Sequence, residues 1–389
     1  MKKVLLLNKI SPLGLNLFDK EQYELGEAID NPDGVLVRSA KMHDMTVGDN
    51  LLAVARAGAG VNNIPVEAYS EKGIAVFNTP GANANGVKEL TLAALFLAAR
   101  NVSGGIRWAS SLECDDVAKA VEKGKSAFGG IELEGKTLGV IGLGAIGGKV
   151  ANAAASSAIG MNVIGYDPYL SIESAWNLSR SVKRASGYEE IFKTCDFITL
   201  HIPATKDTKG MIGKETLSMM KDGVRLINLS RAELVDTDAL KEALLQGKVA
   251  RYVTDFPTND TIGVEGIVTI PHLGASTEES EDNCAAYAAK ELIDYLENGN
   301  IKNSVNFPNV SMPRSSAIRL CVLHRNIPAV LSRISSAVAA EKINIAHMTN
   351  ASKGEFAYTL ADLDADAVSQ DLVDMIMTVD GVIRVRVIN

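Results

Sequence analysis

Short apolar runs alternate with helical or polar segments along the first hundred residues of the chain. Each run is four residues long and has the composition of a strand buried in a parallel sheet. The four runs are residues 4–7, 34–37, 52–55 and 74–77. This alternation predicts a small α/β domain. Residues 86–100 then predict a long Ala- and Leu-rich helix, and the polar segment 103–130 predicts one helix near residues 116–123.

The stretch from Leu138 to Asp167 predicts a dinucleotide site. It consists of an apolar strand, the pattern Gly142-x-Gly144-x-x-Gly147, an Ala-rich helix and a second apolar strand that ends at Asp167. Gly142 permits the tight turn, Gly144 leaves room for a pyrophosphate, and Gly147 lets the helix pack close to the strand. Asp167 can accept hydrogen bonds from both hydroxyls of an adenosine ribose and would repel a 2′-phosphate, so NAD is the expected cofactor. The alternative is a plain βαβ unit.

The same pattern continues towards residue 300. Further strands are expected at residues 196–200, 224–228, 250–254 and 266–270. A helix over residues 236–246 is expected to end at Gly247, a natural C-cap. Ser276 and Glu279 have the spacing of a capping box that opens a helix to about residue 297.

The last part of the chain predicts a third unit. Residues 303–315 contain two prolines and are typical of a linker. Strand, helix, strand, strand, helix and strand are then expected at residues 317–323, 328–341, 343–348, 356–361, 366–379 and 382–388. This βαββαβ order is ferredoxin-like. The predicted fold class is therefore α/β, with two doubly wound parallel-sheet (Rossmann-like) domains and a C-terminal ferredoxin-like domain.

Composition and charge argue against several classes of function. The 389 residues include 47% hydrophobic residues and 33 glycines, which suits a compact α/β enzyme. A net charge of −8 without a basic cluster argues against a nucleic-acid partner. The N-terminus has no signal-peptide pattern and the longest apolar stretch, residues 92–99, is too short to span a bilayer, so a cytoplasmic protein is expected. The four cysteines lack metal-ligand spacing, and no metal site is expected.

Arg231 and His272 are the candidates for catalysis. Each follows a strand of the predicted dinucleotide domain by one to three residues, so both should lie at the sheet edge that carries the glycine loop. A guanidinium can bind a carboxylate with two hydrogen bonds, and an imidazole can take a hydroxyl proton as hydride leaves for nicotinamide. This pair suits the oxidation of a 2-hydroxy acid. The alternative for His272 is a surface or packing role, and His201, at another strand end, is expected to shape the adenine pocket.

Two strand ends of the first domain are suited to an anion. One strand continues into Arg38, Ser39 and Lys41, and the next continues into Arg56 and the segment Gly58-Ala59-Gly60. Ligands of open parallel sheets bind beyond the carboxyl ends of the strands, and a glycine-rich loop offers backbone N–H groups there. These residues are therefore candidate substrate contacts. The alternative is that both arginines are solvated surface charges.

Together these motifs resemble those of the D-2-hydroxyacid dehydrogenases. The resemblance rests on the glycine pattern with Asp167, on Asn228-Leu229-Ser230-Arg231, and on Pro271-His272-x-Gly274-Ala275-Ser276-Thr277. Residues 56–64 and Asn78-Thr79-Pro80-Gly81-x-Asn83 extend it to the first domain. Residues 322–328, with Ile343-Asn344-Ile345, resemble part of an ACT domain.

The resemblance implies an activity and a division into domains. The combination with an ACT domain implies NAD-dependent oxidation of 3-phosphoglycerate to 3-phosphooxypyruvate, the first step of L-serine biosynthesis. The implied domains are a substrate-binding domain (1–100 and 276–305), an NAD-binding domain (101–275), a linker (306–316) and an ACT domain (317–389). A homodimer through the NAD domain, or a homotetramer, is also implied.

The resemblance also implies roles for individual residues. Arg231 would bind the substrate carboxylate and His272 would act as acid and base. NAD contacts are implied for Gly142, Gly144, Ala145, Ile146, Gly147, Asp167, Pro203, Thr208, Leu229, Ser230, Gly274 and Ala275. Substrate contacts are implied for Arg38, Ser39, Lys41, Gly58, Ala59, Gly60, Asn83 and Lys125.

The chain departs from the family pattern at the partner of the catalytic histidine. The family usually has Asp-Val-Phe-x-x-Glu-Pro, in which the Glu orients and charges the histidine, whereas this segment reads Thr-Asp-Phe-Pro-Thr-Asn-Asp. Asn259 takes the Glu position, and Asp255 is the acid expected to meet the nicotinamide amide. An Asn can orient His272 but does not stabilise its charged form, so His272 is expected to protonate less readily than in relatives. Asp260 and Glu265 are the alternative partners.

His324, Asn326 and Asn344 match the residues with which ACT domains of this enzyme class bind serine at an interface between domains. L-Serine is therefore the expected effector. Alternatively, Asn326 only caps the next helix, and the tail is an oligomerisation module without a ligand. For the whole chain, the alternatives are a D-2-hydroxyacid dehydrogenase for 2-hydroxyglutarate or glycerate, and an NAD-sensing binding protein without turnover.

Overall fold

The computed structural model describes residues 1–389, with the exception of the Glu173 side chain. The chain forms two compact units. The first comprises Met1–Asn83 and Glu281–Asn389, and the second comprises Ala84–Ser280. Each unit is described by itself below.

The second unit is built on one parallel sheet of seven strands. Its order is β12-β11-β10-β9-β6-β7-β8, and every pair of neighbours is parallel. The strands are β6 (Thr137–Ile141), β7 (Asn162–Tyr166), β8 (Val182–Arg184), β9 (Phe197–Leu200), β10 (Val224–Asn228), β11 (Val249–Thr254) and β12 (Ile267–Thr269). The chain reverses its direction across the sheet between β6 and β9, which confirms the predicted doubly wound arrangement.

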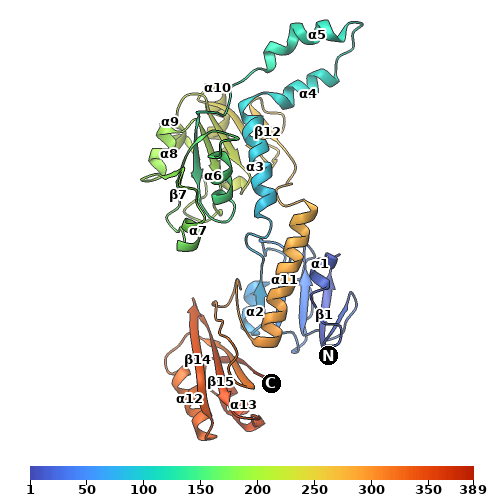
Figure 1. Ribbon diagram of the computed structural model, residues 1–389, viewed down its shortest axis with the longest axis vertical. Helices are drawn as coiled ribbons and strands as arrows, with labels where there is room; N and C mark the ends of the chain where they lie inside the picture. The colour runs from blue at the N-terminus through green and yellow to red at the C-terminus, as the bar shows by residue number, and fades with distance from the viewer. The chain divides into compact units, whose positions relative to one another are not determined.

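Helices cover both faces of this sheet (Figure 1). They are α3 (Ala84–Ala99), α6 (Gly147–Ala154), α7 (Ile172–Trp176), α8 (Tyr188–Thr194), α9 (Lys214–Met219) and α10 (Thr237–Leu245), with a short 3-10 turn η2 (Ala232–Leu234). Leu95 of α3 and Val150 of α6 share a core with Val140 of β6. The other face is packed by a second core that includes Ile191 and Leu240. Helix α3, which the sequence suggested for the first domain, therefore packs with the second unit.

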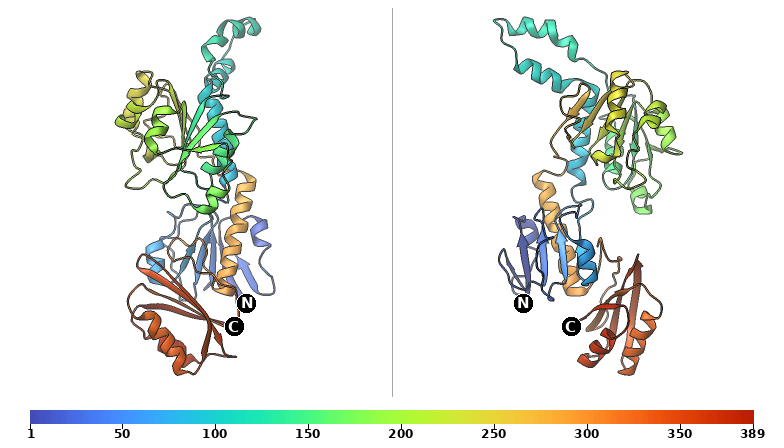
Figure 2. Two further views of the ribbon diagram at one scale, coloured as in Figure 1. Left: turned by 60° about the vertical axis from the view of Figure 1, so that its left-hand side comes forward. Right: turned by 180° about the vertical axis from the view of Figure 1, so that it is seen from behind.

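A helical arm follows α3 and extends away from the seven-stranded sheet (Figures 1 and 2). It consists of α4 (Val102–Ser110), α5 (Val117–Gly124) and the 3-10 turn η1 (Lys125–Phe128). The Trp108 and Phe128 rings pack against each other with centroids 5.1 Å apart. Neither α4 nor α5 has a buried residue within the described chain, so the apolar side of the arm is not covered by its own unit.

The first unit contains a parallel sheet of five strands in the order β2-β1-β3-β4-β5. The strands are β1 (Lys2–Leu7), β2 (Tyr23–Gly26), β3 (Gly34–Val37), β4 (Ala53–Arg56) and β5 (Ala75–Phe77). The helices are α1 (Pro12–Leu15), α2 (Val66–Glu71) and the long α11 (Glu278–Asn298). The predicted capping box at Ser276 is wrong, because the helix begins one residue after Thr277, whose Oγ1 accepts the N–H of Ser280 (3.1 Å).

The C-terminal part of the first unit is an antiparallel sheet of four strands with two helices. Its element order, strand–helix–strand–strand–helix–strand, is the predicted one, and its sheet order is β14-β15-β13-β16. The elements are β13 (Ile318–Arg325), α12 (Val330–Ala340), β14 (Asn344–Lys353), β15 (Phe356–Asp364), α13 (Gln370–Met377) and β16 (Val382–Ile388). We call residues 317–389 the C-terminal module.

The C-terminal module shares a hydrophobic core with the rest of the first unit. Leu323, Tyr358 and Leu360 on one face of its sheet belong to the same buried cluster as Phe77 and Tyr295. The opposite face packs on α12 and α13 through residues such as Ile334 and Leu372. The module is therefore docked by one sheet face.

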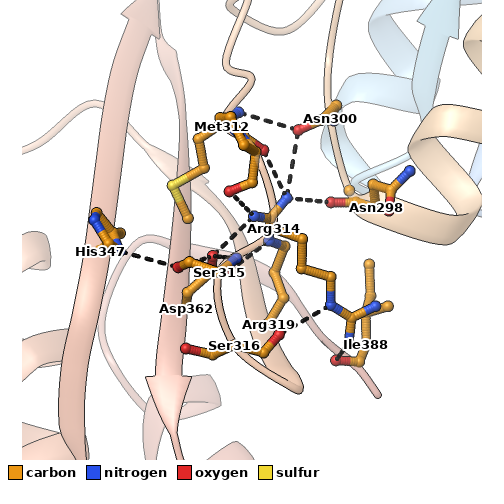
Figure 3. Close-up of polar contacts among 12 residues, drawn as sticks. Asn298, Asn300, Met312, Arg314, Ser315, Ser316, Arg319, His347, Asp362 and Ile388 are labelled. Atoms are coloured by element: carbon orange, nitrogen blue, oxygen red, sulfur yellow. Dashed lines mark hydrogen bonds and ion pairs between the residues drawn. The ribbon is translucent and has the colours of Figure 1, made fainter.

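A buried ion pair lies where the module meets the preceding chain (Figure 3). Arg319 and Asp362 are both fully buried and are joined by hydrogen bonds of 2.6 and 3.0 Å. The Arg319 guanidinium also donates to the carbonyls of Asn298, Met312 and Pro313. Asn298 is the last residue of α11, so the module provides donors for a helix C-terminus that would otherwise lack them.

Candidate active site

The glycine loop of the second unit has the geometry expected for close approach of a ligand. Gly142 has φ +88°, and a Cβ there would lie 2.5 Å from the carbonyl oxygen of His201. A Cβ on Gly147 would lie 1.9 Å from the carbonyl oxygen of Gly142. Gly144 instead faces open space, since no atom of the described chain lies within 4 Å of its Cβ position. Two glycines therefore permit the turn and its packing, and the third leaves room for a bound group.

Asp167 is fixed to this loop by backbone hydrogen bonds. Its Oδ2 accepts the N–H of Leu143 and its Oδ1 accepts the N–H of Tyr169, each at 2.9 Å. Each oxygen retains a lone pair for a further donor. A carboxylate held in this position at the end of β7 fits the two ribose hydroxyls of an adenosine. Together with the open space at Gly144, it shows that these residues fit a dinucleotide.

Arg231 is placed by a turn that the buried Asn228 organises. The Asn228 Oδ1 accepts the N–H groups of Ser230 and Arg231 at 3.1 and 3.3 Å, and its Nδ2 donates to the carbonyl of Arg231 at 2.7 Å. Ser230 Oγ donates to the carbonyl of Leu200 on the neighbouring strand. The turn is thus rigid, while the Arg231 side chain is exposed and can bind a ligand.

Phe256 brings Arg231 and His272 to one place. The ring of His272 packs on that of Phe256 with centroids 4.6 Å apart, and the Arg231 guanidinium lies 5.9 Å from the same ring. Both polar side chains are exposed. The sequence predicted that both residues follow strands of one sheet; these strands, β10 and β12, are not neighbours but lie on either side of β11. The sequence did not single out the aromatic ring.

Asp255 precedes Phe256 and is fully buried. Neither of its carboxylate oxygens has a hydrogen-bond partner within the described chain. A Cβ on Gly274 would lie 3.4 Å from the Oδ2 of Asp255, so this carboxylate lies against the loop that carries His272. Burial raises the pKa of the Asp255 carboxyl above its usual value, and the positive charges of His272 and Arg231 oppose this rise.

Asn259 forms no hydrogen bond with His272 in the described chain. It is exposed in a turn that Thr258 and Thr261 close, and no described residue forms a hydrogen bond to its side chain. Asp260, one alternative partner for His272, lies 3.7 Å from Lys241. Glu265 lines a separate pocket with Arg251 and Val264. Of the candidate acids, Asp255 is the one whose carboxylate lies against the His272 loop.

Two further groups border the glycine loop. His201 forms a 3.0 Å hydrogen bond between its Nε2 and Thr199 Oγ1, and burial lowers the pKa of its imidazole to about 4. It is therefore neutral at physiological pH and is a poor candidate for the base. Thr208 Oγ1 donates to the carbonyl of Pro203 at 2.7 Å and accepts the N–H of Thr205, which orders the loop after β9.

The candidate anion residues of the first unit line one pocket of about 590 Å³. The lining residues are Ser39, Lys41, His43, Arg56, Asn62 and Asn63. The sequence missed His43, for which it offered no context. Asn8 was also missed, although its Oδ1 accepts the N–H groups of Arg38, Ser39 and Ala40 and so orders the loop. That loop can therefore offer side chains, but not these N–H groups, to a ligand.

The two arginines of this loop region differ in their surroundings. The Arg38 guanidinium pairs with Glu281, with both side chains partly exposed. The Arg56 Nε donates to the carbonyl of Arg38 at 3.0 Å, and burial lowers the pKa of its guanidinium. A Cβ on Gly58 would lie 2.7 Å from Arg56 Nη1, which explains the need for glycine at this position. No carboxylate of the described chain pairs with Arg56, so it is the better candidate for an anion.

Two other predicted substrate residues lie elsewhere. Lys125 begins η1 in the helical arm and pairs with Glu122 at 2.5 Å. Asn83 is the last residue of the first segment of the first unit and is partly buried.

The three predicted effector residues do not meet in one module. His324 is buried, with Nδ1 2.8 Å from the carbonyl of Arg325 and Nε2 3.0 Å from Thr359 Oγ1. Asn344 is paired with Asp364 at one end of the sheet, whereas His324 is paired with Ala357 at the other end. Asn326 lies beyond His324 and donates to the carbonyl of Gly354. Asn344 is therefore separated from the other two by most of a strand, roughly 25 Å.

The chain belongs to the D-isomer specific 2-hydroxyacid dehydrogenase family. Residues 92–274 match the NAD-binding domain of that family, so the second unit is an NAD-binding domain. Among curated relatives, the D-3-phosphoglycerate dehydrogenase of Haemophilus influenzae is 32% identical over 382 residues, which are 94% of this chain and 88% of that protein.

Two other similarities point in the same direction. The D-3-phosphoglycerate dehydrogenase of Methanocaldococcus jannaschii is 37% identical over 305 residues, which are 76% of this chain and 56% of that protein. The chain thus spans about half the length of that relative. The solved structure of NAD+-bound 3-phosphoglycerate dehydrogenase from Entamoeba histolytica is 28% identical, with a TM-score of 0.60 over 78% of this chain and 98% of that one.

No helix in the described part of the chain is both long enough and apolar enough to cross a membrane.

Proposed function

We propose that the chain oxidises 3-phosphoglycerate to 3-phosphooxypyruvate with NAD, the first step of L-serine biosynthesis. The observation that carries this proposal is the joint placement of Arg231 and His272 on the ring of Phe256, within the NAD-binding unit. The identity to D-3-phosphoglycerate dehydrogenases selects this substrate among the 2-hydroxy acids.

The proposed roles follow from the chemistry of these groups. NAD supplies the hydride acceptor when bound. Arg231 binds the carboxylate of the substrate through two parallel N–H donors and polarises the oxygen at C2. His272 takes the proton of the C2 hydroxyl during oxidation and returns it during reduction. The residues of the glycine loop and Asp167 hold the pyrophosphate and the adenosine ribose, and the Asn228 turn keeps Leu229, Ser230 and Arg231 in position.

Considered by itself, the pocket of the first unit is proposed to be suited to a phosphate group. Arg56 supplies a partly buried guanidinium that lacks a carboxylate partner within the described chain, and Ser39, Lys41 and His43 line the same pocket. A phosphate suits such a group because it accepts several charge-assisted hydrogen bonds. Arg38 is a weaker candidate because Glu281 already pairs with it. The functional domains are proposed to follow the boundaries expected from the sequence, except that α3 packs with the NAD-binding unit.

A panel of 2-oxo acids tests the proposal. NADH oxidation is measured with phosphooxypyruvate, oxaloacetate, 2-oxoglutarate and hydroxypyruvate, each with and without L-serine. We expect phosphooxypyruvate to give the highest kcat/KM, and an Arg56→Gln variant to lose most of its preference for the phosphorylated substrate over hydroxypyruvate. Preference for 2-oxoglutarate or hydroxypyruvate in the parent would assign another D-2-hydroxyacid. NADH binding without turnover on any substrate would identify an NAD-sensing protein.

We also propose that the C-terminal module is an ACT domain that binds L-serine between two copies of the module. One copy would provide Asn326 and the other Asn344, since the two residues lie at opposite ends of one sheet. His324 would act from its buried position, where protein groups contact both ring nitrogens. Turnover that does not change with L-serine, together with no serine binding by calorimetry, would leave the module with a structural role.

The helical arm is proposed to bind a second copy of the chain. Ile106 and Val117 are 61% and 51% exposed, and neither α4 nor α5 buries a residue within the described chain. The arm tip carries Glu113, Asp115 and Asp116, while the charged residues that line a pocket of about 830 Å³ beside β12 are Arg107, Arg251 and Glu265, two cations and one anion. The opposite charges of tip and pocket favour a symmetric pair of chains. Association through the C-terminal modules would make a tetramer.

A further inference from the structure

His272 lacks the acid partner that an acid–base histidine needs. A carboxylate near the imidazole stabilises the imidazolium that forms when the ring takes a proton. Within the described chain, no carboxylate forms a hydrogen bond or ion pair with His272, and Asn259 carries no charge and forms no hydrogen bond with it.

Asp255 is the acid that the fold brings to this place. It directly follows β11, is 0% exposed, and precedes the residue whose ring packs on His272. Its Oδ2 lies 3.4 Å from the position that a Cβ on Gly274 would occupy. The carboxylate is therefore packed between the Phe256 segment and the His272 loop.

The surroundings offset the burial of the Asp255 carboxylate only in part, through the nearby backbone N–H groups of Gly274 and of Asp255 itself and through the charges of His272 and Arg231. Both oxygens lack a hydrogen-bond partner within the described chain, whereas buried carboxylates normally accept several hydrogen bonds. Thr254, its neighbour on β11, already accepts the N–H of Phe256 with its Oγ1. The titratable or charged groups around Asp255 are His272, Arg231 and the buried Tyr252. Two of these three carry or can acquire a positive charge.

We propose that Asp255 is the positioning residue of His272 and supplies the negative charge that the Asn at position 259 cannot. The carboxylate stabilises the imidazolium formed when His272 accepts the proton of the C2 hydroxyl, and its unused lone pairs remain available to a donor of the bound cofactor. The proposal rests on the role of His272 in the proposed function. It stands as the alternative to the expectation from the sequence that His272 has no acidic partner.

The first test is the titration of His272 in the cofactor-free protein by NMR of labelled histidine. The chain has five histidines, and the signal of His272 is assigned by its loss in a His272→Gln variant. We expect the His272 signal of Asp255→Asn to change its dependence on pH towards the acidic side, because the variant lacks the negative charge that favours the imidazolium. Asn259→Ala is the matched control and should leave the titration curve unchanged. Superimposable curves for Asp255→Asn and the parent, or an acidic displacement in Asn259→Ala, overturn the proposal.

The second test is the pH profile of kcat/KM for oxidation of 3-phosphoglycerate. In Asp255→Asn the acidic limb should move to lower pH by the shift that the NMR measures, and the plateau should fall about tenfold or more. Asp255→Glu keeps a carboxylate and should restore the acidic limb, which a merely structural role would not predict. Circular dichroism shows whether each variant is folded. If the parent turns over no 2-hydroxy acid, the proposed function fails, while the NMR titration still decides whether Asp255 and His272 interact.

Discussion

Asp255 is a residue at which function and stability are expected to conflict. A buried carboxylate without hydrogen-bond partners costs folding free energy, and burial raises the pKa of this carboxyl. We therefore predict that Asp255→Asn unfolds at a higher urea concentration than the parent at pH 8, by about 1 kcal/mol in the free energy of unfolding. Catalysis should be weaker in the same variant.

The difference in the free energy of unfolding between Asp255→Asn and the parent is expected to depend on pH. A carboxyl whose pKa is higher in the folded state than in the unfolded state favours folding while it is protonated. This stability is lost as the pH rises from the pKa of the unfolded state through the pKa of the folded state. The advantage of Asp255→Asn should therefore shrink as the pH falls towards the usual pKa of an aspartate. A parent that is more stable than the variant at pH 8 would mean that the carboxylate has favourable partners in the cofactor-free protein.

A substitution at Arg231 tests whether the substrate carboxylate needs two parallel N–H donors. A lysine at this position keeps the positive charge but cannot present two parallel N–H donors to a carboxylate. We expect Arg231→Lys to lower kcat/KM for phosphooxypyruvate about a hundredfold, with an unchanged dissociation constant for NADH measured by fluorescence. Equal loss of NADH binding would show that the change disturbs the Asn228 turn instead.

The residues of this site were only partly predictable from the sequence. Strand ends and motif spacing led to Arg231 and His272, because ligands of parallel sheets bind at that edge. The partner of His272 was not predictable, since an alignment on Phe256 places Asn259 in the acidic position and the exposure of Asn259 depends on the fold. Asn8 was missed for a similar reason, because its contacts with residues 38–40 are 30 to 32 residues away in the sequence.

At the scale of elements, apolar runs predicted every central strand and four of the six edge strands, which are β5, β12, β14 and β16. The sequence missed β2 and β8, which lie at the edges of their sheets and contain few buried residues. It also missed α4. No residue of α4 is buried, so its apolar side chains do not form a face that packs on the core. An edge element buries one side only, so its pattern carries less information.

The contact between the C-terminal module and α11 allows a prediction for whole elements. Arg319 and Arg386 of the module donate to the carbonyls of Asn298, Tyr295 and Leu296, which lie in the last turn of α11. Arg319→Met removes the donors to Asn298, Met312 and Pro313 and leaves the buried Asp362 without its cationic partner, with only the hydrogen bonds from Ser315. Such a loss typically costs about 3 kcal/mol or more. The double variant Arg319→Met/Asp362→Leu should recover much of this loss, as measured by thermal unfolding.

A control variant and a second measurement test whether Arg319 holds the C-terminal module in place. Arg333 is an exposed residue of α12, so Arg333→Met should change the unfolding temperature little. Limited proteolysis should cut residues 311–316, the continuous part of the expected linker that is not buried, faster in Arg319→Met than in the parent. Equal cleavage and equal unfolding temperatures in all variants would show that the shared apolar core alone holds the module.

At the scale of the whole molecule, the helical arm carries apolar side chains that its own chain leaves exposed. Ile106 and Val117 are exposed on helices without buried residues within the described chain, and a soluble monomer rarely exposes a contiguous apolar surface of this kind. The charges of its tip oppose those of the pocket beside β12. Both features favour association through the NAD-binding unit.

Ile106→Asp is the variant that tests this association. An introduced carboxylate would be buried without a partner if the arm packs on a second chain, so we expect the dissociation constant of the dimer to rise tenfold or more. Ile172→Asp is the matched control, because Ile172 is 80% exposed on α7, away from the arm. Sedimentation at several protein concentrations measures both. A parent that is monomeric at micromolar concentration contradicts the proposal, and so does an Ile106→Asp variant that sediments like the parent. Weakened association in both variants alike would show that added charge, rather than the arm, controls the assembly.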